Sequence, residues 1–370
     1  MLPVLFRISI GAAWARPALA ALVVAIALGR AIAYMVRSRR DGDRVSLLGA
    51  LWDDATTLVL LAAAAAALAA SGYLDQDVSI PVPTYGALIA LAFVLGTWLA
   101  QREAARQGQD PERIADLGFW VLVAALVGSH VYFVLVNAHD YFSPDTWLTD
   151  APLVGRVLSA ITFGAIETAR FPRFLLPAGL VFYGGFIAAV LTAAWYMRRH
   201  GMPFLPYADT MIPSVALGHF LGRLGCFSAG CCWGDVCSSH LPWAVRFGPG
   251  SLAYDTLVGR DQPGRFLSGG LTLPLHPTQL YEAFGELALF LLLVVVVRPR
   301  KRFHGQVLAT WLVLYAVLRT VVESFRGDVE RGVVLGLGVG QWTSAGILAA
   351  GVAIWLRARR TPAPAAELAT

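Results

Sequence analysis

The sequence predicts an all-α integral membrane protein, and three observations carry that prediction. Hydrophobic residues make up 57% of the 370 residues, whereas only 14% are charged. The apolar residues occur in runs of near-membrane length rather than in amphipathic stripes. The arginines gather at the ends of these runs, as is typical of the loops of a polytopic membrane protein.

The charge balance does not indicate a nucleic-acid partner. The formal net charge is +5, but the basic residues stand where membrane topology and anionic lipid account for them. The sequence contains no phosphate-binding loop, no Gly-rich dinucleotide-binding turn and no zinc-protease motif. These enzyme classes are therefore excluded, and we expect neither a cofactor nor a nucleic acid.

Two apolar segments precede the main unit. The first, at about residues 17–36, has Arg7 and Arg16 before it and further arginines after it. A signal peptide is the alternative, but the run is long, Arg30 interrupts it, and no clear small-residue cleavage site follows. We favour a retained helix, followed by a second one at about residues 47–71. Residues 1–82 are thus predicted to be an N-terminal membrane extension.

Residues 83–358 form the main predicted unit, which has seven candidate spans. The spans are expected at about residues 84–101, 114–137, 178–197, 206–226, 277–297, 304–323 and 337–356. With the extension, the total is about nine helices. The Pro- and Ala-rich tail, residues 359–370, is predicted to be a disordered cytoplasmic segment.

The distribution of arginine predicts on which side of the membrane each loop lies. Basic segments lie at residues 37–44, 102–113, 198–200, 298–302 and 357–360. These segments fall on one side of the predicted membrane, and the positive-inside rule places that side in the cytoplasm. Loops 138–177, 227–276 and 324–336 are then outside. Arg223 in the fourth span and Arg319 in the sixth lie at a similar depth near the outer face, so they can share one cavity.

Four polar side chains interrupt the sixth span at helical spacing. Tyr315, Arg319, Glu323 and Arg326 follow one another at intervals of four, four and three residues, which places them on one face of a helix. Unpaired charges are costly in a membrane, so this face should line a protein interior or a wet cavity. Two arginines against one glutamate predict a positive site for a lipid phosphate, because a guanidinium matches phosphate oxygens bidentately. The alternative is an ion pair that only joins helices.

The fourth and fifth spans carry two further motifs. Gly218, Gly222 and Gly225 form a stripe of small residues that lets another helix approach closely, and Arg223 lies within that stripe. The fifth span opens with His-Pro-Thr-Gln-Leu-Tyr-Glu at 276–282. Its Thr, Gln and Glu side chains can cap the helix, so ordinary helix-start chemistry is the alternative to a binding function.

All four cysteines fall within twelve residues of the outer loop. They are Cys226, Cys231, Cys232 and Cys237. An oxidising compartment favours one or two disulfides that staple this loop, with a connectivity that the sequence does not give. A metal site with His240 or His219 is one alternative, although the spacing is not a usual zinc or iron-sulfur spacing. A redox-active thiol pair is another.

Taken together, these residues resemble the prolipoprotein diacylglyceryl transferase family over about residues 83–356. The matching features are Tyr85-Gly86, the basic loop 102–113, Gly184-Gly185, Ala208-Asp209, Gly222-Arg223-x-Gly225 with Phe227 and Gly234, the motif at 276–282, and Tyr315, Arg319, Glu323 and Arg326. The resemblance implies a seven-helix enzyme of the bacterial inner membrane. It would transfer the diacylglyceryl group of phosphatidylglycerol to the lipobox cysteine thiol of a prolipoprotein and release glycerol phosphate.

The resemblance also implies residue roles. Arg223 and Arg319 would hold or polarise the phosphate, with Tyr183 and Glu323 as further catalytic residues. The implied substrate-binding residues are Tyr85, Gly184, Gly185, Asp209, Gly222, Gly225, Gly234, His276, Tyr281, Glu282, Tyr315 and Arg326. Tyr183 stands where the family usually has histidine before its Gly-Gly pair, and a phenol with a pKa near 10 is a poor base at neutral pH.

The signature after Arg223 also departs from the family pattern. Cys226 and Ala229 replace two asparagines, and Cys231 replaces a glutamate. Two alternatives to the expected transferase therefore stay open. One is an enzyme of the same fold that moves a phospholipid-derived group to another acceptor, and the other is a non-catalytic lipid-binding or thiol-redox membrane protein. In each case the site is expected to face the outer leaflet.

Overall fold

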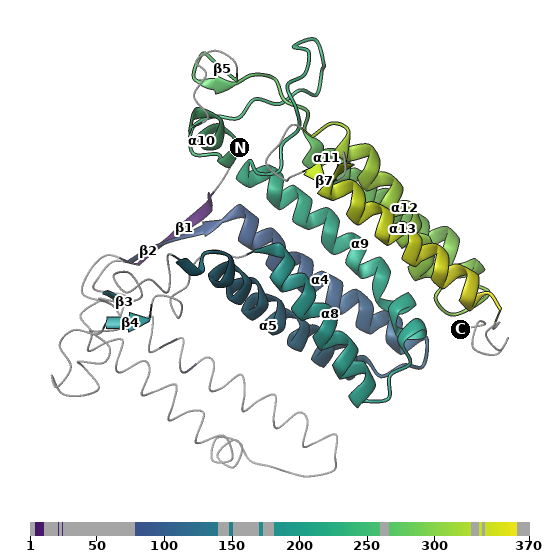
Figure 1. Ribbon diagram of the computed structural model, residues 1–370. Helices are drawn as coiled ribbons and strands as arrows, with labels where there is room; N and C mark the ends of the chain where they lie inside the picture. Colours follow the sequence, from purple (N-terminus) through teal and green to yellow (C-terminus); the bar gives the residue numbers. More distant parts are fainter. Residues whose placement is uncertain are drawn as a thin grey trace, which may run out of the picture. The chain divides into compact units, whose positions relative to one another are not determined.

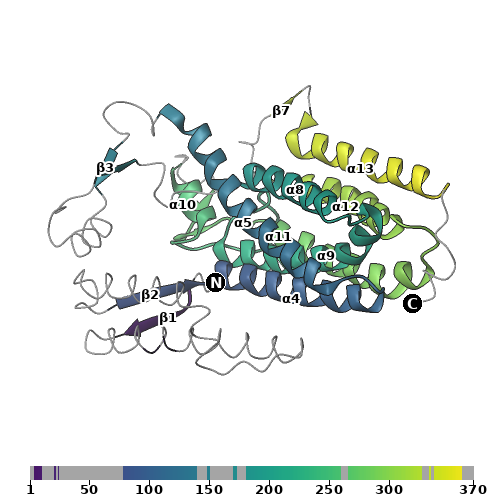
Figure 2. The same cartoon turned by 90° about the horizontal axis from the view of Figure 1, so that it is seen from below.

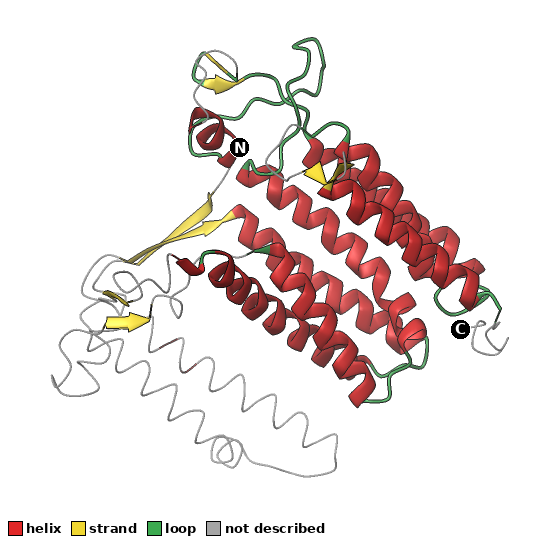
Figure 3. Ribbon diagram, viewed as in Figure 1, coloured by secondary structure: helices red, strands yellow, loops and turns green. Residues whose placement is uncertain are grey.

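The computed structural model describes residues 4–10, 21, 24, 78–139, 148–150, 170–172, 181–259, 266–326, 333–334 and 337–360. Its helices are α4 (Thr84–Arg106), α5 (Pro111–Val136), α8 (Phe182–Arg199), α9 (Phe204–Ala229), α10 (Leu252–Gly259), α11 (Thr278–Leu292), α12 (Gln306–Glu323) and α13 (Val339–Ala358). A π-helical turn, Leu293–Val297, and a 3₁₀ turn, Arg298–Arg300, extend α11. Figures 1 and 3 show that helices dominate the described chain.

Each of the seven predicted spans in residues 83–358 coincides with one long helix, and α10 is an additional short helix in a loop. Among the residues that the structure describes, four segments are long and apolar enough to cross a membrane: α4, α5, α11 extended to Arg300, and α12. The helix α9 carries Asp209, His219 and Arg223, which lower its hydropathy. The predicted N-terminal helices at 17–36 and 47–71, and the tail from residue 361, lie outside the described residues.

Four short two-stranded sheets complete the described structure. They pair β1 (Val4–Ile10) with β2 (Val78–Pro83), β3 (Leu148–Asp150) with β4 (Arg170–Pro172), β5 (Leu267–Ser268) with β6 (Leu271–Thr272), and β7 (Val333–Val334) with β8 (Leu337–Gly338). The last three pairs are antiparallel, with Leu148 opposite Pro172, Leu267 opposite Thr272 and Val333 opposite Gly338. None of these sheets forms the core.

The chain divides into two compact units. The first comprises residues 1–6, 82–128 and 185–370, and the second comprises residues 7–81 and 129–184. In the second unit, the described residues include the end of α5 and the start of α8, where the Val181 N–H donates to the Ser129 carbonyl at 3.2 Å. The arginines and glutamates considered below all belong to the first unit.

The helix α9 is the centre of the first unit. It packs against α4 on one side and against α11 and α12 on the other, and α13 covers α12 (Figures 1 and 2). Two helix pairs, α9 with α4 and α11 with α12, approach so closely that a glycine is required at the contact. A Cβ on Gly225 would lie 3.0 Å from the Tyr85 ring of α4, and a Cβ on Gly285 would lie 2.5 Å from Leu318 of α12. The predicted small-residue stripe thus faces α4, although Gly218 has open space around it.

The first unit has polar groups inside and apolar groups outside. Val94 on α4 and Leu191 on α8 are 62% and 64% exposed, whereas Glu282 and Glu286 on α11 are 1% and 0% exposed. This distribution suits a bundle whose outer surface contacts lipid, because lipid is as apolar as the side chains that face it. The fold therefore supports a multi-pass membrane protein with charged side chains in its interior.

One end of the bundle carries the loop that joins α9 to α11, and we call it the site end. Its described residues, 230–259 and 266–277, contain α10, β5 and β6, of which Figure 1 labels α10 and β5. The loop has an apolar core of its own, made by Trp233, Phe247, Ala253, Leu257 and Leu275. It is therefore a packed cap on the bundle.

Asp209 lies at the opposite end and caps a helix there. Its carboxylate accepts hydrogen bonds from the N–H groups of Gly305 and Leu308, at 2.6 and 2.9 Å, and pairs with Lys301 at 3.1 Å. It therefore stabilises the N-terminus of α12. Asp209 also lies about 21 Å from Arg223 along α9, at 1.5 Å per residue. The role of Asp209 in substrate binding stays a prediction.

We predict that Asp209→Ala destabilises the protein by about 2–4 kcal/mol, because it leaves two helix N–H groups and the Lys301 ammonium without their buried acceptor. Asp255→Ala on α10, where the aspartate is exposed, is the control and should change stability by less than about 0.5 kcal/mol. Thermal unfolding in one detergent measures both. Equal stability of the two variants would contradict the capping role.

Candidate active site

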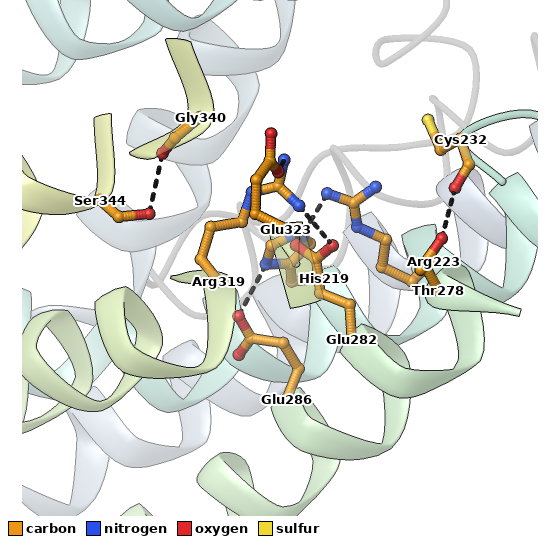
Figure 4. A network of polar contacts seen from close by, with 10 residues as sticks. All are labelled: His219, Arg223, Cys232, Thr278, Glu282, Glu286, Arg319, Glu323, Gly340 and Ser344. Carbon is orange, nitrogen blue, oxygen red and sulfur yellow. Dashed lines mark hydrogen bonds and ion pairs between the residues drawn. The ribbon is translucent and has the colours of Figure 1, made fainter. Parts of the chain in front are cut away.

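A buried carboxylate joins two arginines at the site end. Glu282 on α11 lies between Arg223 on α9 and Arg319 on α12 (Figure 4). Its Oε1 is 2.8 Å from Arg223 Nη2, and its Oε2 is 3.3 Å from Arg319 Nη1. Three helices that are distant in sequence are thereby linked through one side chain. The predicted convergence of Arg223 and Arg319 is present in the structure.

A second carboxylate extends this network along α11. Glu286, one turn after Glu282, accepts from Trp311 Nε1 at 3.2 Å and contacts His219 Nδ1 at 2.8 Å. His219 Nε2 lies 3.5 Å from Glu282 Oε1, so the imidazole bridges the two carboxylates. The Tyr315 ring stacks on Trp311, with centroids 5.2 Å apart. Tyr315 therefore forms part of the wall beside His219, as its position on the sixth span predicts.

Glu323 completes the surroundings of Arg319. Its Oε2 lies 2.6 Å from Arg319 Nη2, and the two residues are one helical turn apart. The start of α13 covers this pair. A Cβ on Gly340 would lie 2.6 Å from Glu323 Cδ, so only glycine fits there without displacing the carboxylate.

Arg223 and Arg319 differ in how many of their guanidinium nitrogens already contact a carboxylate. Arg319 is 8% exposed and contacts a carboxylate with each of its two terminal nitrogens. One terminal nitrogen of Arg223 contacts Glu282, while its buried Nε has no hydrogen-bond partner among the described residues. Arg223 is therefore the arginine with a donor available for a phosphate, because a guanidinium has five N–H groups.

The charge balance differs from the predicted positive patch. Glu282 contacts both Arg223 and Arg319, and Glu323 contacts Arg319. Glu286 joins this network through His219, so three carboxylates accompany these two guanidiniums. The sequence prediction missed Glu286 because it considered the sixth span alone. A carboxylate within the apolar run of the fifth span, four residues after Glu282, is the signal that could have identified it.

Arg326 does not share the helical face that its spacing predicts. The helix α12 ends at Glu323, and Arg326 follows in a turn, where its backbone forms an isolated β-bridge with Gly234. Gly234 occupies a tight position, because a Cβ there would lie 2.6 Å from His276 and from the Phe325 carbonyl. Gly234 therefore lets the loop, α11 and the end of α12 meet at one point.

The motif at 276–282 fixes the loop rather than capping α11. No side chain caps this helix. Instead, Thr278 Oγ1 donates to the Cys232 carbonyl at 2.9 Å, and Gln279 Nε2 donates to the Cys231 carbonyl at 2.6 Å. His276 Nδ1 lies 3.1 Å from the Tyr281 hydroxyl, which also accepts from Trp243 Nε1 at 2.9 Å. The predicted capping by Thr278, Gln279 and Glu282 is therefore wrong, since these side chains make tertiary contacts.

Three of the four cysteines come together beside Arg223. All four are free thiols in the structure, so the predicted disulfides stay a prediction. The Sγ atoms of Cys226, Cys231 and Cys232 all lie within 4.8 Å of one another, whereas Cys237 is outside this group. Hydrogen bonds from the Cys226 and Cys231 thiols lower the pKa of Cys232 despite its burial, and the charges of Arg223 and Arg326 lower it further.

The remaining predicted residues lie at two places. Tyr85, at the start of α4, is 43% exposed and packs on Gly225. A Cβ built on Gly222 would lie 3.6 Å from the Ile89 side chain of the same helix α4. Tyr183 is 50% exposed in the first turn of α8, where Gly184 and Gly185 are buried. Tyr183 and Gly184 belong to the second unit, and their roles stay predictions.

Replacement of Gly340 tests the contact between α13 and Glu323. We predict that Gly340→Ala costs about 1–3 kcal/mol of stability, because the added methyl group displaces the carboxylate from Arg319. Gly346→Ala on the same helix is the matched control, since a Cβ there meets nothing within 4 Å. Thermal unfolding in detergent measures the melting temperatures of both variants, and that of Gly340→Ala should be the lower. The same melting temperature for both would show that Glu323 is not confined by α13.

Comparison with known proteins places this arrangement in a family. The family model described as prolipoprotein diacylglyceryl transferase matches residues 75–357. A phosphatidylglycerol-prolipoprotein diacylglyceryl transferase of Finegoldia magna is 30% identical over 282 residues, which cover 76% of this chain and 93% of that protein. A protein of the same name from Proteus mirabilis is 32% identical over 287 residues, covering 75% and 87% of the two chains. The chain belongs to the prolipoprotein diacylglyceryl transferase family.

Proposed function

We propose that the protein transfers the diacylglyceryl group of phosphatidylglycerol to the lipobox cysteine thiol of a prolipoprotein. Family membership and the names of the relatives support the donor and the acceptor. The observation that carries the proposal is the geometry of Arg223, whose guanidinium is anchored on Glu282 and keeps a buried, unpartnered Nε. A cation held in this way can receive a phosphate without first reorganising.

The reaction requires a good leaving group and a thiolate. The sulfur forms a bond to the glyceryl carbon that bears the phosphate ester, the bond from that carbon to oxygen breaks, and glycerol phosphate leaves. Negative charge grows on the departing phosphate, so Arg223 would stabilise it most strongly as the bond breaks. Arg326, beyond the end of α12, would contribute a second positive charge.

Arg319 is proposed to act through Glu282 rather than on the phosphate. Its two terminal nitrogens are used by Glu282 and Glu323. It would therefore fix the carboxylate that orients Arg223, and Glu323 would fix Arg319 in turn. Tyr85 and Tyr315, with the backbone at Gly222 and Gly225, are proposed to shape the lipid pocket. The roles of Tyr183, Gly184 and Gly185 are proposed from the family resemblance alone.

The membrane placement is also a proposal. Seven helices in residues 83–358 would cross the bacterial inner membrane, and the site end would face outward, because the arginine-rich loops belong to the cytoplasm. The cap over the site end would then receive a prolipoprotein after its signal segment enters the membrane. Residues 1–82 are proposed to be an additional membrane segment, and residues 359–370 a cytoplasmic tail.

A second candidate is an enzyme of the same fold with a different acceptor. It is favoured by the changed lining beside Arg223, where Cys226, Ala229 and Cys231 replace the amides and the glutamate of the family pattern. The phosphate site would be retained while the acceptor differs. A third candidate, a lipid-binding or thiol-redox protein without transferase activity, would bind phosphatidylglycerol without turnover.

Arg223→Lys tests the proposal. A lysine keeps the charge but loses the forked geometry that holds Glu282 and the phosphate together, so we expect kcat to fall about 100-fold or more. The assay follows labelled diacylglycerol from phosphatidylglycerol to a lipobox peptide. Arg359→Lys, an exposed arginine at the opposite end of the bundle, is the control and should keep full activity.

The outcomes separate the three candidates. Thioether product in the wild type and its loss in Arg223→Lys support the proposal. Release of glycerol phosphate without labelled peptide would favour the second candidate. Binding of phosphatidylglycerol without release of glycerol phosphate would favour the third.

A further inference from the structure

The ending of α9 brings the three thiols together. Gly230 has φ 68°, and the Cys231 N–H donates to the Cys226 carbonyl at 3.1 Å, as in a Schellman ending. The chain therefore turns back on the last turn of α9. Cys232 has φ 60°, a left-handed conformation that is unfavourable for a non-glycine residue. The hydrogen bonds from Thr278 and Gln279 hold this strained segment in place.

The spacing of the sulfurs suits a shared ion. A thiolate binds Zn²⁺ at about 2.3 Å, so tetrahedral coordination separates its sulfurs by about 3.8 Å. The Sγ atoms of Cys226, Cys231 and Cys232 lie within 4.8 Å of one another, so an ion needs a contraction of no more than about 1 Å. A disulfide would use only two of these three thiols, whereas an ion uses all of them.

The fourth coordination position has no protein ligand among the residues that the structure describes. Neither Cys237 nor a histidine or carboxylate of this part of the chain joins the group of three. Three protein ligands and one open position are typical of catalytic rather than structural zinc sites. The cysteines are partly exposed, so a ligand from outside can reach them.

The surroundings suit a negatively charged centre. Three thiolates and one Zn²⁺ ion carry a net charge of −1, and a fourth thiolate makes it −2. Arg223 lies one turn before Cys226 on α9, and its positive charge lies near Cys226 and Cys232. A cation beside the ligating sulfurs offsets their negative charge, and such outer contacts tune the metal.

We propose that Cys226, Cys231 and Cys232 bind one Zn²⁺ ion, and that its open position takes the cysteine thiolate of the acceptor. The second part rests on the proposed diacylglyceryl transfer. The proposal assigns a function to the residues that replace the family's amide and glutamate, because a coordinated thiol is deprotonated at neutral pH. It also supplies thiol activation in a chain that has Tyr183 in place of the usual histidine.

The step balances without a redox partner. The acceptor thiol releases its proton to water when its sulfur coordinates the ion. The sulfur then forms the bond to the glyceryl carbon, and the electron pair of the broken carbon-oxygen bond leaves with glycerol phosphate. The thioether product is a neutral and weaker ligand, so it dissociates and the ion keeps its oxidation state.

Metal content of the reduced full-length protein tests the site. We expect the wild type and Cys237→Ser to hold about one Zn²⁺ per chain, and Cys226→Ser, Cys231→Ser and Cys232→Ser to hold close to none. Cys237→Ser is the matched control, because it removes a thiol from the same loop but outside the group. Failure of the reduced wild type to take up Zn²⁺, or equal uptake by all variants, would overturn the site. A disulfide among the three thiols that persists under reductant would do the same.

Cobalt substitution tests the open position without relying on turnover. We expect the Co²⁺-loaded protein to show thiolate charge-transfer absorption that strengthens when a lipobox peptide is added, and not when the lipobox cysteine is replaced by serine. The same response to both peptides would overturn acceptor coordination. Transfer that persists after a chelator has removed all metal would also overturn it while leaving the proposed transferase intact. A cysteine-dependent spectral change without any transfer would instead contradict the proposed function and leave the metal site standing.

Discussion

The ion pairing of Glu282 is the interaction on which the rest of the site depends. Its carboxylate is 1% exposed and contacts one guanidinium with each oxygen, so three helices converge on one side chain. A buried charge of this kind is stable only with its partners in place, and the loss of one partner typically costs about 3–5 kcal/mol. The pairing therefore fixes the positions of α9, α11 and α12 at the depth of Arg223.

The first turns of α11 connect this network to the thiols. Thr278 and Gln279 hold the carbonyls of Cys232 and Cys231, and Glu282, one turn later, holds Arg223. One short helical segment thus positions the residue proposed to bind the phosphate and the loop that carries the sulfurs. Gly234 adds a third constraint, since the loop passes between His276 and the Phe325 carbonyl with no room for a side chain. Arg223, which is proposed to bind the phosphate, and the thiols consequently share one support.

Much of the fold follows from the sequence. The long apolar runs predict helices at positions where the described chain has long helices, four of which are candidate membrane spans. The alternation of basic loops predicts that Arg223 and Arg319 lie at one depth. The partners of these arginines could not be predicted from the sequence. Glu282 and Glu286 belong to another helix, and the packing of the helices determines which charged side chains come into contact. Asp209 shows the same limit, since its function depends on helix α12, almost one hundred residues away. The prediction that Arg326 shares the helical face of Arg319 is wrong for a local reason, because α12 ends three residues before Arg326.

The cysteines illustrate a different limit of sequence analysis. Their spacing, four residues between the first two and four between the last two, matches no usual metal motif. An oxidising compartment then favours disulfides. The turn at Gly230 brings Cys226 beside Cys231 and Cys232, and Cys237 is outside this group. A helix ending followed by a left-handed residue is not visible in the spacing of the cysteines.

A double-mutant cycle on Arg319 and Glu282 tests most directly whether Arg319 acts through Glu282. The measured quantity is kcat for diacylglyceryl transfer in Arg319→Gln, Glu282→Gln and the double variant. If the two side chains act as one unit, the double variant should be little worse than either single variant, with a coupling energy of about 1 kcal/mol or more. Additive losses in the double variant would contradict this account, because they would mean that Arg319 acts on the substrate independently of Glu282.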